Sequence, residues 1–192
     1  IRDRASTAAL EQASGGVRKA VLGALEARTS TARHAWGCWR VLALLLLRLR
    51  AHDVVFTVPR LLALQDALTT APVPHAPARW AVLLAYLRLA AALLGCADLR
   101  ALAKTAAHDA RARGATCPEL TLHGDALVYR RARKGARAPR STDTAAPLAV
   151  TVPRERVVAL LCSVPAVQHD YPNARAILNG DAEPALPEPV VV

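Results

Sequence analysis

The stretch ARWAVLLAYLRLAAALLG, residues 78–95, is the longest nearly continuous apolar segment of this 192-residue chain. Apolar side chains would occupy most of the circumference of a helix formed by these residues, so the pattern predicts a central helix that neighbouring elements bury on all sides. Three prolines precede this segment, and Gly95 is placed to end the helix. Because 53% of the residues are hydrophobic and 21% are charged, we expect a sizeable core.

Helical periodicity continues on both sides of this segment. Apolar residues recur at helical spacing with polar residues between them, and the expected helices cover residues 8–27, 31–53, 57–68, 78–95, 99–113 and 153–161. We expect Ser14, Gly15 and Gly16 to interrupt the first of these helices. We expect the third to begin at a Thr57 cap, with Pro59 in its first turn.

The apolar period changes from helical to alternating after Pro118. Residues 120–131 alternate on either side of Gly124-Asp125, which is a turn signal, so the sequence predicts a β-hairpin. We expect a third strand at residues 147–152 and, beyond Pro165, a loop and a proline-rich tail. The predicted fold class is therefore mainly α with a small antiparallel β-sheet, an α+β protein.

A strongly basic segment follows the predicted hairpin. It reads VYRRARKGARAPRS over residues 128–141 and contains six cations and no acidic residue. Like charges this close together repel one another, and they are tolerated most easily on an exposed loop whose partner is a polyanion. We therefore expect double-stranded DNA to contact the five arginines of the segment, which are Arg130, Arg131, Arg133, Arg137 and Arg140. The alternative interpretation is a solvated basic loop.

The whole chain is basic, with a net charge of +10 and an isoelectric point near 10.5. Lys19, Lys104 and Lys134 are its only lysines, and every other cation is an arginine. Such a ratio in an alanine-rich chain indicates a GC-rich coding sequence. Part of the positive charge then reflects codon usage rather than selection for phosphate binding.

Metal, cofactor and membrane functions receive no support from the sequence pattern. The four cysteines stand singly and the six histidines share no ligand spacing, so we expect no zinc site, no disulfide framework and no cofactor. The longest apolar runs, residues 41–47 and 81–95, are too short to span a bilayer. We expect an intracellular, reducing location, nuclear or cytoplasmic. Because the chain contains no methionine, even at position 1, we expect a fragment, a processed product or a truncated reading frame.

The order of the expected elements resembles the first half of the catalytic domain of tyrosine recombinases, the phage-integrase family. The successive segments, within residues 57–161, read TVPRLLALQDAL, ARWAVLLAYLRLAAALLG, ADLRALA, ALVYRRARKGARAPR and PLAVTVP. ADLRALA fits the acid-Leu-x-x-Leu signature of that family. The resemblance implies a remnant of a helical DNA-clamping domain at residues 1–55, a partial catalytic domain at residues 56–165 and a tail at residues 166–192.

The resemblance carries over one catalytic residue, Lys134, as the hairpin lysine that protonates the leaving oxygen. Gly95 stands where the first family arginine would be, and Pro172 stands where a His-x-x-Arg motif beginning at His169 needs its arginine. Tyr171 follows the sheet too closely to be the nucleophile. The implied function is DNA binding in the recombination or integration of a mobile element, with no strand cleavage by this chain. The implied partner is duplex DNA, bound by a monomer or a homo-oligomer.

A second interpretation from a different class stays open. The chain could be a helical interaction protein, such as a viral structural or scaffold protein, in which residues 78–95 dock a partner and the basic hairpin is incidental. In both interpretations Trp36 and Trp39 are expected to pack as core anchors, because helically spaced aromatic residues usually do so.

Overall fold

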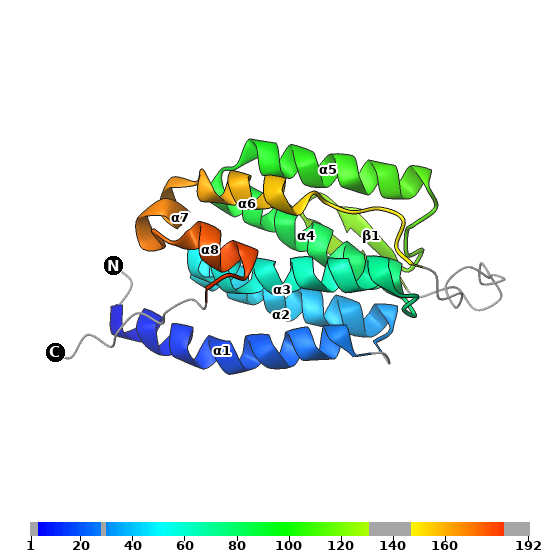
Figure 1. Cartoon of the computed structure of the whole chain (residues 1–192). Helices are drawn as coiled ribbons and strands as arrows, with labels where there is room; N and C mark the ends of the chain where they lie inside the picture. Colours follow the sequence, from blue (N-terminus) through cyan, green and yellow to red (C-terminus); the bar gives the residue numbers. More distant parts are fainter. Residues whose placement is uncertain (1–3, 28–29, 131–146, 183–192) are drawn as a thin grey trace.

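The computed structural model describes residues 4–27, 30–130 and 147–182, and there the chain is mainly helical with one two-stranded antiparallel sheet (Figure 1). The predicted fold class, mainly α with a small antiparallel sheet, is confirmed. The helices are α1 (Arg4–Glu26), α2 (Ala32–Leu49), α3 (Ala51–Thr70), α4 (Ala76–Leu94), α5 (Ala97–Ala112), α6 (Arg154–Cys162), α7 (Pro165–Asp170) and α8 (Ala174–Asn179). The strands are β1 (Leu120–His123) and β2 (Ala126–Tyr129).

Helix α4 is the central element, as its apolar sequence predicts. It packs against α2, α3, α5 and both strands. Gly95 ends it with a left-handed backbone, φ 71°, which glycine adopts without strain. By length and composition α4 could cross a membrane, contrary to the expectation from its shorter apolar run, but 67% of it is buried inside the protein. Most of its apolar surface is therefore covered by other elements of this chain.

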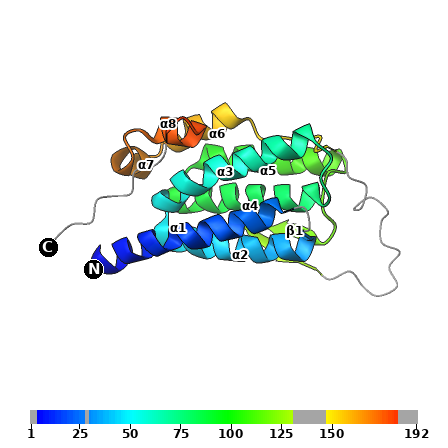
Figure 2. The ribbon, with the colours of Figure 1, turned by 60° about the horizontal axis from the view of Figure 1, so that its bottom comes forward.

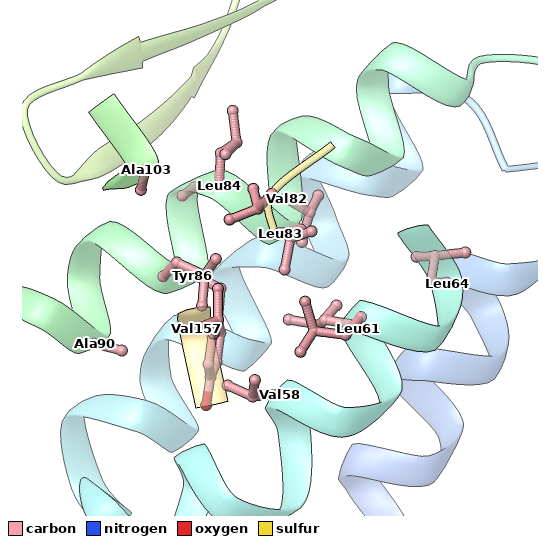
Figure 3. Close-up of a cluster of buried hydrophobic side chains, with 14 of the residues drawn as sticks. Val58, Leu61, Leu64, Val82, Leu83, Leu84, Tyr86, Ala90, Ala103 and Val157 are labelled. Atoms are coloured by element: carbon pink, nitrogen blue, oxygen red, sulfur yellow. The ribbon is translucent and has the colours of Figure 1, made fainter. Parts of the chain in front are cut away.

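The core around α4 draws side chains from helices far apart in the sequence. Figure 3 shows Val58 and Leu61 from α3, Leu83 and Tyr86 from α4 and Val157 from α6 converging on one region, and each is at most 1% exposed. The buried cluster extends from α1 to α8. All three regions that are expected as separate parts of the chain, residues 1–55, 56–165 and 166–192, therefore contribute to it. Helix α3 runs through residue 55, where the first expected segment ends.

The predicted hairpin is present and covers one side of α4. Leu120 pairs with Tyr129 and His123 with Ala126, and Gly124 has the positive φ, 59°, that the turn between the strands requires. Strand β2 packs against α2 and α4, and β1 packs against α4. Helices α6–α8 lie on a different side of the bundle, against α3 and α5 (Figures 1 and 2).

Two predicted helix boundaries are wrong. Helix α1 is continuous through residues 14–16 because packing against α2 and α3 holds the flanking turns, and the hydroxyl of Ser14 donates to the carbonyl of Glu11 at 2.7 Å without interrupting it. Helix α3 begins at Ala51, so Thr57 and Pro59 lie inside it. The break between α2 and α3 is instead at Arg50, whose φ is 49° and whose guanidinium donates to the carbonyl of Leu93 at 3.2 Å. A cation at that carbonyl interacts favourably with the C-terminal end of α4.

The third strand expected at residues 147–152 does not form. The backbone of this segment is satisfied by α3 instead of by a strand: the N–H of Leu148 donates to the carbonyl of Leu68 at 2.9 Å. The buried amide of Gln65 accepts from the N–H of Val152 at 2.8 Å and donates to its carbonyl at 3.0 Å. It also accepts from the indole of Trp80 at 3.2 Å. One glutamine side chain thus supplies the partners that a neighbouring strand would otherwise provide.

The prediction of a loop beyond Pro165 is also wrong for the residues up to 179. Pro165 begins α7, and α8 follows it. Val167, Ile177 and Leu178 are buried, and both helices pack against α3. Proline is tolerated at the start of α7 because the first N–H of a helix has no partner within the helix.

A buried ion pair joins three helices of this core. Asp53 on α3 is fully buried and accepts from the Arg18 guanidinium of α1 at 2.9–3.0 Å. Its other oxygen accepts from the hydroxyl of Tyr86 on α4 at 2.7 Å. Burial raises the pKa of Asp53 above its ordinary value, while Tyr86 and Arg18 lower it. The carboxylate is therefore tolerated in the core because both of its oxygens have donors.

We predict that Asp53→Ala lowers the free energy of unfolding by about 3–5 kcal/mol, because it leaves the Arg18 charge buried without a partner. The matched control is Asp66→Ala, which removes an ion pair to Arg154 whose acidic side chain is 59% exposed, and the expected loss is at most about 1 kcal/mol. Urea unfolding followed by circular dichroism measures both. Equal losses in the two variants would contradict this account of the core.

Candidate nucleic-acid interface

Arg130 is the one expected DNA contact that the structure describes. It follows directly after β2, its side chain is exposed, and its N–H donates to the carbonyl of Glu119 at 2.8 Å. No ion pair joins it to another described residue. The other expected contacts and the carried-over lysine lie outside the described residues: Arg131, Arg133, Lys134, Arg137 and Arg140.

Helix α2 supports the end of β2 through an aromatic contact. The indole of Trp36 donates to the carbonyl of Leu127 at 3.2 Å, and its ring centroid lies 5.8 Å from that of Tyr129. The guanidinium of Arg40 lies 5.0 Å from the centroid of the Trp36 ring, within the range of a cation–π interaction. The Trp36 ring is therefore held between the hairpin and an arginine.

Two cations of α2 lie on the same side of that helix as Trp36. Arg33, Trp36 and Arg40 are three and four residues apart, a spacing that aligns side chains on one helix face. Both arginines are exposed. We call the surface formed by Arg33, Trp36, Arg40, Tyr129 and Arg130 the hairpin face.

The hairpin face could not have been assembled from the sequence. Trp39 is 5% exposed and packs in the core as expected. Trp36 is only partly buried, and its contact with Leu127 spans 91 residues. The one available signal was the spacing of Arg33, Trp36 and Arg40, which gives no indication of what lies beside them.

The resemblance compares three further residues with catalytic positions of tyrosine recombinases, and these residues do not gather at the hairpin face. Gly95 ends α4, and His169 and Tyr171 belong to α7 and its C-terminal cap. Helix α7 packs against α3, whereas β2 packs against α2 and α4. Tyr171 is therefore placed on a different side of the molecule from Arg130.

Tyr171 is engaged with a buried histidine. Its hydroxyl lies 2.5 Å from Nδ1 of His52, which is 5% exposed, and Nε2 of His52 has no hydrogen-bond partner among the described residues. Burial, with the nearby charges of Glu11 and Asp170, raises the pKa of Tyr171 to about 12. The phenol is thus protonated at neutral pH and joins α7 to α3, which is a structural role.

Comparison of the chain with protein-family models, with curated proteins and with solved structures found no match. In the described part of the chain, no group of three or more histidine, cysteine, aspartate or glutamate side chains is placed to hold a metal ion.

We predict that the free energy of unfolding falls as the pH drops from about 6.5 to about 4, in part because of His52. Burial, reinforced by the Arg18 charge, lowers the pKa of His52 to about 4 in the folded state. The unfolded chain therefore binds a proton in this pH range that the folded protein excludes. His52→Gln should show a shallower decline, measured by urea unfolding at several pH values.

The control for this prediction is His123→Gln, at an exposed position in the hairpin. It keeps the buried Asp53 and the partly or fully exposed Glu11 and Asp170, so its decline should match that of the unsubstituted protein. A His52→Gln decline as steep as that of the control would show that His52 does not carry the effect.

Proposed function

We propose that this chain binds duplex DNA through the hairpin face and the basic segment attached to it, in the recombination or integration of a mobile element. The observation that carries the proposal is that the exposed Arg130 directly follows Tyr129, whose ring contacts Trp36, the tryptophan that also holds Arg40. In the sequence, five further cations follow within ten residues of Arg130. DNA binding in this role would place the protein in the nucleus or the cytoplasm.

Electrostatics supports a phosphate backbone as the ligand. Arginine side chains that contact phosphates release condensed counterions, and this release supplies most of the affinity for DNA without base recognition. Arg40 is oriented by the Trp36 ring, so it loses little conformational freedom on binding. Several of the other described arginines are already engaged, for example Arg18 with Asp53 and Arg154 with Asp66.

The proposed relation to tyrosine recombinases is limited to binding. The order of α3, α4, α5, hairpin and α6 supports this relation, whereas the third strand that the resemblance implies at residues 147–152 does not form. Lys134 would then be the hairpin lysine. We do not propose strand cleavage, because Gly95 stands at the position of the first family arginine and cannot stabilise charge on a scissile phosphate.

A second candidate function is protein interaction through α2. Leu44 and Leu47 are 61% and 44% exposed, and they continue the helical stripe of Arg33, Trp36 and Arg40. Exposed leucines in a row are a feature of protein-binding helices. This version of the interaction hypothesis uses α2 rather than the buried α4.

We predict that replacing Arg33, Arg40 and Arg130 with glutamine weakens binding to a labelled DNA duplex and flattens its salt dependence. Each lost phosphate contact should reduce the slope of log K against log salt by about 0.9. Fluorescence anisotropy between low and moderate salt measures the affinity and the slope. We expect the same direction when Arg131, Arg133 and Arg137 are replaced.

The matched control replaces three exposed cations on α1, α6 and α8: Lys19, Arg156 and Arg175. It removes the same total charge, so a loss as large as that of the hairpin-face variant would refute the assignment. A gel shift with heparin as competitor, together with sizing by light scattering, distinguishes DNA binding from the second candidate function, protein interaction. A stable oligomer whose DNA is displaced as readily as that of any basic protein would favour protein interaction.

A further inference from the structure

A half-open groove of about 430 Å³ lies between α4, α5 and β1, on the opposite strand of the hairpin from the hairpin face. Its α4 side is one helical stripe that includes Pro77, Trp80, Leu84 and Arg88. Eleven residues separate the ends of this stripe, so the groove extends over about 16 Å of helix. Its volume is within the range of small-molecule binding sites.

The groove has an apolar floor and a basic rim. Trp80, Leu84 and Leu120 contribute buried apolar surface. The rim on α5 carries the exposed side chains of Lys104 and Arg111, one turn on either side of His108. None of the described residues that line the groove is an aspartate or a glutamate. Its rim therefore favours an anion, whereas its floor favours an apolar or aromatic group.

Arg88 gives the groove a further cation with unused hydrogen-bonding capacity. Its Nε lies 3.8 Å from an oxygen of Asp125, a long ion pair, and this buried Nε has no hydrogen-bond partner among the described residues. The other oxygen of Asp125 accepts from Arg100 at 2.7 Å. Two arginines thus share one carboxylate, and a positive charge remains beside the groove.

We propose that this groove binds a nucleoside phosphate, either as a free nucleotide or as the phosphorylated end of a nucleic-acid strand. The apolar floor would contact the base, and Lys104, Arg111 and Arg88 would donate charge-assisted hydrogen bonds to the phosphate oxygens. The inference does not depend on duplex binding, because the groove uses α5 and β1 whereas the hairpin face uses α2 and β2.

The test is calorimetric titration with four probes: ATP, adenosine, a 5′-phosphorylated tetranucleotide and the same tetranucleotide without the phosphate. If the ligand is a free nucleotide, we expect ATP to bind at least tenfold more tightly than adenosine. If the ligand is the end of a nucleic-acid strand, we expect the phosphorylated tetranucleotide to bind at least tenfold more tightly than the unphosphorylated one. The phosphate probe that binds more tightly identifies the source of the ligand. Lys104→Gln and Arg111→Gln should each weaken that binding about tenfold, because each removes a hydrogen bond to a charged group.

The control substitution is Lys19→Gln, on the exposed surface of α1, and it should leave the affinity unchanged. The indole N–H resonance of Trp80, which is 2% exposed and lines the groove, should shift on titration, while that of Trp39, which does not line the groove, should not. Thermal unfolding verifies that the variants fold. The proposal is overturned if no phosphate probe binds, if the probes without phosphate bind equally well, or if Lys19→Gln weakens binding as much as Lys104→Gln.

Discussion

Helix α4 is apolar around most of its circumference, and it is stable in water only when other elements cover most of its surface. Helices α2, α3 and α5 cover three of its sides, and the hairpin covers a further side. The two strands are four residues long, and a hairpin of that size is marginal without a surface to pack on. Contact with α4 and α2 provides that surface. The burial of α4 therefore fixes where β2 ends and where Arg130 enters the solvent.

Several buried polar side chains of this core are held by groups from other elements. Arg79 on α4 is 1% exposed and donates to the last carbonyl of α1, that of Glu26, at 3.2 Å and to that of the following Ala27 at 2.7 Å. A cation at the C-terminal end of a helix is favourable both as a donor and as a charge. Together with Asp53 and Gln65, this arginine determines how α1 and the segment 147–152 pack on the bundle.

The sequence was most informative where a local pattern decides the structure. The apolar segment at 78–95 and the Gly124 turn gave α4 and the hairpin correctly. Local patterns failed to predict the structure where a residue far away in the sequence determines it. Val152 bonds to a glutamine 87 residues away instead of to a strand, and Pro59 is accommodated inside α3 because packing holds both halves of that helix. The hairpin face and the groove are combinations of separate elements, so no linear motif predicts them.

The most direct measurement of the central claim uses the three tryptophans of the chain. Their indole N–H groups give separate resonances in a ¹H–¹⁵N correlation spectrum. Trp36 lies on the hairpin face, whereas Trp39 is 5% exposed and packs in the core. Titration with a DNA duplex should shift the Trp36 resonance progressively to saturation and leave that of Trp39 in place. A duplex that binds without moving the Trp36 resonance would contradict the assignment of the hairpin face as the DNA-binding surface.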